Sequence, residues 1–200
     1  MLIIFSLIIL LFSVVIHEIS HGSVAYALGD STAKDAGRLT LNPLKHLDPF
    51  GSIILPLLLL LFTGGQGPIF GWARPVPINP YNFRDQKWGI VKVAIAGPAA
   101  NFLLAIIFGL LIRFSFFPSQ FSSFFPDVVF INLLLGLFNL VPISPLDGFN
   151  FFFNILPNTF WRIKIILQQY GIFILIFFIF FGLRFLGPLI FYLYKLIVGS

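Results

Sequence analysis

The stretch His17-Glu18-Ile19-Ser20-His21 decides how the chain is organised, because it sets three ionisable side chains inside an apolar run from residue 2 to about residue 28. Two histidines four residues apart lie one above the other on one helix face, so both imidazoles can bind one metal ion. Glu18 projects beside them, where it can take a proton from a water molecule. This spacing is typical of a zinc site with one open coordination position.

The apolar surroundings favour a bound metal ion at this motif. An ionisable side chain in hydrocarbon costs roughly a few kcal/mol, so such a cluster needs a compensating partner, and a cation provides one. Two other interpretations stay open on the motif alone. One is a buried His/Glu cluster that is hydrogen-bonded to neighbouring helices, and the other is a proton relay in a transporter.

The composition is that of an integral membrane protein. Of the 200 residues, 58% are hydrophobic and 10% are charged, whereas about 25% of the residues in a soluble domain are charged. Several apolar runs approach the roughly 20 residues that cross a bilayer as a helix, and no stretch has the long alternation of a barrel strand. We therefore expect an all-α polytopic membrane protein.

About four full transmembrane helices are predicted, together with one short helix. The full spans are expected at residues 2–28, 89–112, 128–140 and 165–186, and an interfacial helix is expected near residues 188–200. The short apolar run 50–62 follows Asp48-Pro49, a pair typical of a helix N-terminus. Basic connectors flank this run on both sides, which favours a re-entrant helix. A complete crossing of a thinned bilayer is the alternative.

The charge pattern and the absence of cysteine narrow the possible functions. The net charge is +5, but the basic side chains are spread over the connectors instead of forming one cluster. They are therefore interpreted as orientation signals and lipid-headgroup contacts, and no nucleic acid is expected as a partner. Because the chain has no cysteine, it has neither thiolate metal ligands nor a cysteine nucleophile.

The segment 67–79 contains too many glycine and proline residues for a helix, and its residues 69–78 could be short extended edges. It predicts either a small β-hairpin with a turn near Gly71 or an interfacial loop anchored by Trp72. An exposed strand edge at this place could pair with an unwound substrate peptide. The sequence does not separate the two interpretations.

A catalytic zinc site needs a third protein ligand, and Asp147 is the best candidate. It follows an apolar span directly, on irregular backbone that Pro142 and Pro145 break and where Gly148 leaves room for close approach. His46 lies in a polar connector and is expected to be a surface residue. The other acidic candidates do not directly follow a membrane span in this way: Asp30, Asp35, Asp48, Asp85 and Asp127.

The motifs together resemble the site-2 protease family of intramembrane zinc metalloproteases. The resemblance is carried by residues 17–21 in an early span, by Ala96-Gly97-Pro98 in a middle span, and by residues 139–148, which end in Leu-Asp-Gly. The small residues of the middle span also permit close helix packing, and Asn101 is expected to bond to a neighbouring helix. Residues 42–51 and 72–80 further resemble a compact prokaryotic branch without a PDZ domain.

This resemblance implies a zinc ion held by His17, His21 and Asp147, with Glu18 as the general base. It also implies a metalloendopeptidase that hydrolyses peptide bonds within or near the cell membrane, close to its cytoplasmic face. Asn139 is a candidate donor to the developing oxyanion, although a helix-capping or packing role is equally consistent with its position.

The expected organisation is a single membrane-embedded domain, with a catalytic core at residues 1–150 and C-terminal membrane segments at residues 151–200. The expected partners are the lipid bilayer and a transmembrane protein substrate. Earlier cleavage of that substrate by another protease and a separate adaptor for substrate selection are further expectations. Family members commonly have a small residue after Leu-Asp-Gly, where this chain has Phe149, and this departure could reshape the pocket.

Two functions of other classes compete with proteolysis. A metal or proton transporter could use the same His/Glu/Asp cluster. Transporters place polar groups along a path, however, whereas here they concentrate at one point. A non-proteolytic protein that binds membrane helices would not need Glu18, which is present.

Overall fold

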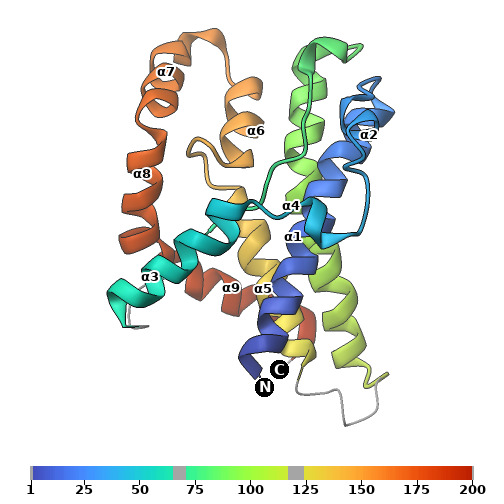
Figure 1. The fold of residues 1–200 in the computed structure, drawn as a ribbon, viewed down its shortest axis with the longest axis vertical. Coiled ribbons are helices and arrows are strands. Elements are labelled where there is room, and N and C mark those ends of the chain that lie inside the picture. The colour runs from blue at the N-terminus through green and yellow to red at the C-terminus, as the bar shows by residue number, and fades with distance from the viewer. Residues whose placement is uncertain (1, 65–70, 117–123, 200) are drawn as a thin grey trace.

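The computed structural model describes residues 2–64, 71–116 and 124–199, and these residues form helices joined by turns and loops (Figure 1). The α-helices are α1 (Leu2–Ala27), α2 (Thr32–Asp35), α3 (Leu55–Thr63), α4 (Gln86–Arg113), α5 (Phe125–Asn139), α6 (Asp147–Ile155), α7 (Trp161–Gln169), α8 (Gly171–Phe177) and α9 (Leu183–Val198). The shorter helical turns are η1 (Pro43–Lys45), η2 (Pro49–Ile54), η3 (Pro80–Asn82), η5 (Asn158–Phe160) and η6 (Phe178–Gly182). The all-α class is confirmed for the described residues.

The long helix α4 is the centre of the fold. It packs against α1, α5, α6 and α9. A core of buried apolar side chains joins α4, α5 and α9: Ala105, Val129, Leu133 and Ile190. In a membrane, close packing of this kind drives helix association, because lipid tails are as apolar as the side chains themselves.

Three helical segments of the described chain are long and apolar enough to cross a membrane, although the third bends between α8 and α9 (Figure 1): Phe5–Ala27, Gln86–Arg113 and Gly171–Val198. Two further apolar helices, Pro49–Thr63 and Phe125–Asn139, are shorter. A helix of 15 residues such as α5 rises about 22 Å, which is less than a hydrocarbon core of about 30 Å. The chain is therefore a multi-pass membrane protein, and the number of complete crossings stays a prediction.

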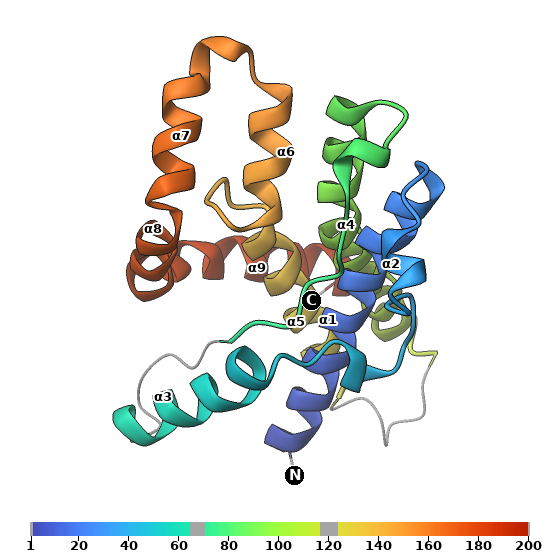
Figure 2. The ribbon, with the colours of Figure 1, turned by 45° about the horizontal axis from the view of Figure 1, so that its top comes forward.

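The C-terminal part differs from its prediction. One continuous span is expected at residues 165–186, but α7 ends at Gln169 and α8 begins at Gly171. The chain bends again after α8, so α8 and α9 run in different directions (Figures 1 and 2). Gly171 lies against the turn before α6, where a Cβ would be 2.4 Å from the Ser144 carbonyl oxygen. The helix expected near residues 188–200 is present over residues 188–198 as part of α9, and its interfacial location stays a prediction.

The short helix predicted after Asp48 is present. The Asp48 carboxylate accepts a hydrogen bond of 2.6 Å from the Gly51 N–H, and Pro49 lies in the first turn. This combination caps a helix N-terminus. The helix continues through η2 and α3 to Thr63, and Gly64 ends it with a φ of 58°. The choice between re-entry and a full crossing stays a prediction.

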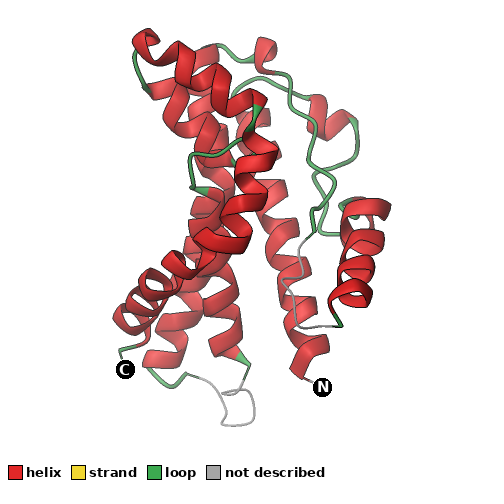
Figure 3. Cartoon of the chain, turned by 90° about the vertical axis from the view of Figure 1, so that its left-hand side faces the viewer, coloured by secondary structure: helices red, strands yellow, loops and turns green. Residues whose placement is uncertain are grey.

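The segment 71–79 is a loop, and no strand forms in the part of the chain that the structure describes (Figure 3). Pro75 and Pro77 explain this in part, because neither has an N–H to donate to a ladder. The β-hairpin expected at residues 69–78 is therefore not found over its described part. Residues 69 and 70 lie outside the described residues.

One side of this loop is fixed to the chain before α3. The Trp72 N–H donates to the Gly51 carbonyl at 3.2 Å, and the Arg74 N–H donates to the His46 carbonyl at 2.9 Å. The Trp72 side chain is half exposed, as expected for the anchored loop that was the alternative to a hairpin.

Candidate metal centre

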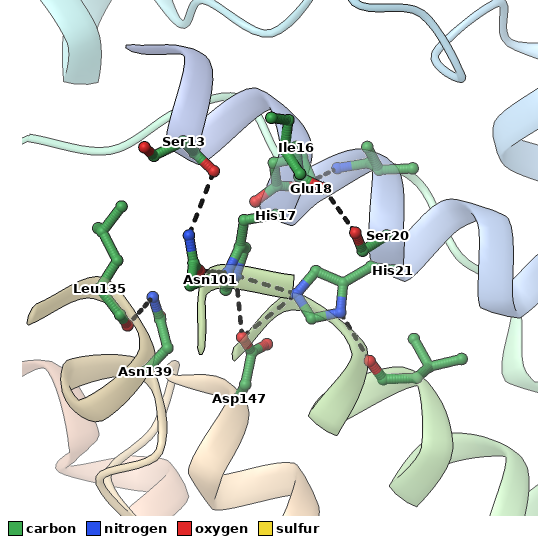
Figure 4. A network of polar contacts seen from close by, with 12 residues as sticks. Ser13, Ile16, His17, Glu18, Ser20, His21, Asn101, Leu135, Asn139 and Asp147 are labelled. Carbon is green, nitrogen blue, oxygen red and sulfur yellow. Dashed lines mark hydrogen bonds and ion pairs between the residues drawn. The ribbon is translucent and has the colours of Figure 1, made fainter. Parts of the chain in front are cut away.

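The structure brings His17, His21 and Asp147 together (Figure 4). The two histidines come from the second half of α1, and Asp147 is the first residue of α6. The Asp147 Oδ2 lies 3.1 Å from the His17 Nε2 and 3.2 Å from the His21 Nε2. The two Nε2 atoms are 3.0 Å apart. Three possible ligand atoms therefore converge on one point.

The hydrogen bonds behind the rings decide which nitrogens are free. The His17 Nδ1 lies 2.6 Å from the Asn101 Oδ1, and the His21 Nδ1 lies 2.7 Å from the Val93 carbonyl oxygen. Both oxygens are acceptors, so each Nδ1 must donate its proton. In a neutral imidazole the Nε2 then carries a lone pair, which is the form that binds metal.

These three atoms fit a zinc ion. Two lone pairs and a carboxylate oxygen at 3.0–3.2 Å repel one another unless a cation lies between them. In a tetrahedral zinc site, bonds of about 2.0–2.2 Å place the ligand atoms about 3.3 Å apart, close to the observed separations. The Asp147 Oδ2 is buried without a hydrogen-bond donor, as expected of a metal ligand. As three protein ligands, these residues would leave a fourth tetrahedral position for water or substrate.

Gly97 of α4 makes room for both rings. A Cβ at this residue would lie 2.4 Å from the His21 Nε2 and 2.6 Å from the His17 Nε2. Real Cβ atoms do not approach so closely, so glycine is required here. The sequence gives Gly97 only as part of a motif and of a small-residue packing surface, and its contact with the rings depends on how α4 is rotated against α1.

A buried chain of polar side chains orients His17. The Asn101 Nδ2 donates to the Asn132 Oδ1, and the Asn132 Nδ2 donates to the Ser13 Oγ, both at 2.9 Å. Asn101 and Asn132 are fully buried. Sequence reasoning assigned Asn101 to helix packing and missed Asn132 and Ser13. The sequence did contain a signal for this chain of hydrogen bonds, because each of two apolar spans carries an amide side chain. Such groups need hydrogen-bond partners in hydrocarbon.

The turn before α6 sets the position of Asp147. Asp147 was expected on irregular backbone, but this backbone ends at Leu146 and Asp147 begins a regular helix. Gly148 permits the close approach of the turn, since a Cβ there would lie 2.2 Å from the Leu140 carbonyl oxygen. The residue thus serves backbone packing beside the centre.

Glu18 is held by the loop 71–79. Its Oε2 accepts a hydrogen bond of 2.8 Å from the Val76 N–H, and Val76 is buried. Glu18 and His21 are three residues apart in α1, which makes their side chains neighbours on the helix surface. This arrangement keeps a carboxylate beside the three converging atoms, with its other oxygen available to a water molecule.

The structure does not bring the remaining candidates to the centre. The Asn139 Nδ2 donates to the Leu135 carbonyl in its own helix at 3.0 Å. His46 was expected at the surface, but it is 1% exposed and its Nε2 lies 2.9 Å from the Thr40 carbonyl oxygen, because the connector folds back over it. The other aspartates serve helix ends, loops or hydroxyl contacts: Asp30, Asp35, Asp48, Asp85 and Asp127.

Comparisons with known proteins identify the family of the chain. Residues 115–180 match the model of Peptidase family M50. The chain is 44% identical over 157 residues to "Putative zinc metalloprotease YwhC" of Bacillus subtilis (strain 168), covering 74% of this chain and 67% of that one. It is 34% identical over 142 residues to "Putative zinc metalloprotease Rip2" of Mycolicibacterium smegmatis, covering 70% of this chain and 52% of that one.

A more distant relative is "Zinc metalloprotease MJ0392" of Methanocaldococcus jannaschii, 30% identical over 161 residues, which are 79% of this chain and 36% of that protein. No solved structure matches the chain. The family predicted from the motifs is confirmed by the family model and by the identity to YwhC. The chain therefore belongs to Peptidase family M50, the site-2 protease family, and is a metalloprotease of that family.

Proposed function

We propose that this metalloprotease is an intramembrane zinc endopeptidase that cuts peptide bonds in the membrane-spanning segments of other proteins. His17, His21 and Asp147 hold the zinc ion, and Glu18 is the general base. The observation that carries this proposal is the convergence of two Nε2 atoms and one carboxylate oxygen within 3.2 Å of one another, inside helices apolar enough to cross a membrane.

Glu18 accepts and then donates the proton in this reaction. When bound, zinc makes water a stronger acid and polarises the substrate carbonyl. The Val76 N–H holds the Glu18 Oε2, so the Oε1 accepts the proton of the attacking water. As the oxygen adds to the carbonyl carbon and the C–N bond breaks, Glu18 gives this proton to the leaving amine nitrogen.

The orientation of both rings supports this chemistry before the substrate arrives. Asn101 and the Val93 carbonyl fix the Nδ1 protons of the two histidines. Partners of this kind set the ring orientation and raise the basicity of the ligand nitrogen. The centre is therefore preorganised, which lowers the free energy needed to reach the transition state.

A transmembrane substrate must also unwind, because its carbonyls are hydrogen-bonded along the helix. Each backbone group freed in hydrocarbon costs several kcal/mol unless it finds a new partner. The loop 71–79 borders Glu18 through Val76 and could offer such partners. Pro75 and Pro77 have no N–H, so at these two residues only the carbonyls could accept hydrogen bonds from the N–H groups of the unwound segment.

The cell membrane, with the metal centre near its cytoplasmic face, is the proposed location. His17 and His21 lie in the second half of α1, which leads into the basic connector 30–48, and basic connectors favour the cytoplasmic side. Within this proposal, another protease cuts the substrate first, and a separate adaptor assists its selection.

The test compares wild type with Glu18→Gln for zinc content and for cleavage of a membrane-spanning reporter. Zinc should stay bound while cleavage falls below detection. Asp35→Asn makes the same carboxylate-to-amide change on an exposed residue and should leave both unchanged. Cleavage that survives in Glu18→Gln would refute the assigned base. Zinc binding without cleavage in the wild type would favour the transporter or the helix-binding protein.

A further inference from the structure

A second polar site lies next to the metal centre. It is a pocket of about 310 Å³ between the connector that follows α2 and the loop 71–79. Three of its lining residues are basic, namely Arg38, Lys45 and Arg74, and none is acidic. From the sequence, each basic residue of the connectors was interpreted as a separate orientation signal. In the fold, these three basic residues surround one cavity.

Arg38 forms the buried part of the pocket. Its side chain is 6% exposed, and its Nη2 donates to the Arg74 carbonyl oxygen at 2.7 Å. Its Nε has no hydrogen-bond partner. A buried cation with an unused donor and no paired carboxylate is unfavourable. Burial and the charge of Arg74 lower the pKa of Arg38, against the opposite effect of Glu18.

Lys45 and Arg74 are exposed, and they line the pocket with Arg38. Neither forms an ion pair with any residue that the structure describes. Three cations around one cavity attract an anion, and a guanidinium matches the planar, two-oxygen geometry of a carboxylate. Leu44 and Leu47 supply apolar wall, which suits the aliphatic stem of an acidic side chain.

The pocket and the metal centre share one wall. Pro75 and Pro77 line the pocket, and Val76 between them donates its N–H to Glu18. Arg38 is also near enough to Glu18 for their charges to interact. A group bound in the pocket would therefore be separated from a bond held at Glu18 by the loop segment 75–77.

We propose that this pocket is a substrate subsite that binds a carboxylate, the side chain of an aspartate or glutamate a few residues from the cleaved bond. The proposal rests on the endopeptidase function proposed above and adds a substrate preference to it. The shared wall favours a peptide carboxylate over a lipid phosphate, since it connects the pocket to the catalytic base.

The experiment uses two membrane-spanning reporters that differ by one residue, a glutamate or a glutamine on the cytoplasmic side of the cut. Wild type should cleave the glutamate reporter with a kcat/KM about tenfold higher, the effect of one charged hydrogen bond. Arg74→Gln should abolish this preference, so that the ratio of the two kcat/KM values falls to about one. Arg84→Gln, on an exposed arginine outside the pocket, should keep it.

Because Arg38 is buried, its substitution could unfold the chain, so the exposed residues carry the test. Arg74→Glu should reverse the preference and favour a reporter with lysine in place of the glutamate. If Arg74 had only a structural role, Arg74→Glu would not reverse the substrate preference. An equal loss of cleavage on all reporters would overturn the proposal.

Binding separates a failure of this proposal from a failure of the proposed function. If wild type cleaves no reporter, fluorescence anisotropy should still show tighter binding of the glutamate peptide, and Arg74→Gln should remove the difference. Equal binding of both peptides would overturn the subsite. If Arg74→Gln instead lowers the cleavage of both reporters equally, and only in vesicles with added phosphatidylglycerol, the pocket binds a lipid headgroup. This result would also overturn the proposal.

Discussion

The metal centre is supported on two sides by different kinds of contact. On its helix side, buried side chains of α1, α4 and α5 bond to one another and orient His17 through Asn101. On its connector side, loop backbone bonds to carboxylates: the Val76 N–H to Glu18, and the Asn79 N–H to Asp30. The helix side orients His17, one of the proposed metal ligands, and the connector side holds Glu18, the proposed base.

This difference implies that metal retention and cleavage depend on separate parts of the molecule. The helix side is packed inside the bundle, where a change in one residue displaces the ligands themselves. The connector side is a loop fixed by a few hydrogen bonds, and loops adjust at a lower energetic cost. Substitutions on the helix side should therefore lower zinc content and cleavage together, whereas those on the connector side should lower cleavage alone.

The largest effect is expected from Gly97→Ala. The added methyl group would lie 2.4 Å from the His21 Nε2, so a ligand ring must move. We expect the zinc affinity to fall at least about 100-fold and cleavage to disappear with it. Competition with a chelator measures the affinity. Gly187→Ala is the matched control, because a Cβ there meets no atom within 4 Å. Full zinc binding in Gly97→Ala would contradict the close packing of α4 on the rings.

A smaller effect of the same kind is expected from Asn101→Ala. His17 would lose the acceptor for its Nδ1 proton, and Asn132 would lose a donor in a buried site. The loss of such an outer partner lowers metal affinity by about 10–100-fold. The same chelator titration measures it, with Asn154→Ala as the control, because the Asn154 amide, among the described residues, donates only to the Asn150 carbonyl of its own helix. If Asn101→Ala bound zinc as tightly as wild type but cleaved slowly, the proposed division of roles between the helix side and the connector side would be wrong.

The helix side was also the easier one to predict from sequence. The spacing of His17 and His21 is local, because four residues make about one helical turn. Asp147 could be selected because a proline-broken turn follows an apolar span. Gly97 and Asn132 could not be assigned in this way, since their contacts depend on the rotation of whole helices against one another.

The connector side and the C-terminal bends could not be predicted, because tertiary contacts decide them. The loop 71–79 has no periodicity, and its position over Glu18 depends on Asp30, which is distant in sequence. Likewise, the separation of α7 from α8 near Gly171 is accompanied by contact with the Ser144 carbonyl. Local patterns predicted the existence of helices well and their joints poorly.

On the connector side, Asp30→Asn should lower cleavage about tenfold and leave zinc content unchanged. The buried Asp30 carboxylate accepts hydrogen bonds from Thr32, Asn79 and Asn82, and an amide cannot accept all of them. The loop would then hold Val76 less firmly against Glu18. Measuring zinc content and reporter cleavage on the same sample tests whether cleavage falls without a loss of zinc. Loss of zinc would show that the connector also supports the ligands.

The pKa shift of Asp30 leads to a prediction of how the stability of the fold depends on pH. Burial raises the pKa of its carboxyl, but hydrogen bonds from Thr32, Asn79 and Asn82 outweigh this effect and leave the pKa below its ordinary value. The stabilisation is therefore complete above the pKa of the unfolded chain and is lost as the pH falls through the lower pKa of the folded chain. From about pH 5 downwards, the melting temperature of wild type should fall more steeply than that of Asp30→Asn.

The smallest effect is expected from Asn139→Ala. The Asn139 amide donates to the Leu135 carbonyl one turn earlier in α5, a local bond of low energetic value. Cleavage should change by less than about threefold, with zinc retained. If Asn139 instead leaves Leu135 in the substrate complex and donates to the oxyanion, kcat should fall about 100- to 1,000-fold. Single-turnover cleavage by the zinc-loaded variant separates these outcomes, and the larger loss would add a catalytic residue from α5 to the helix side.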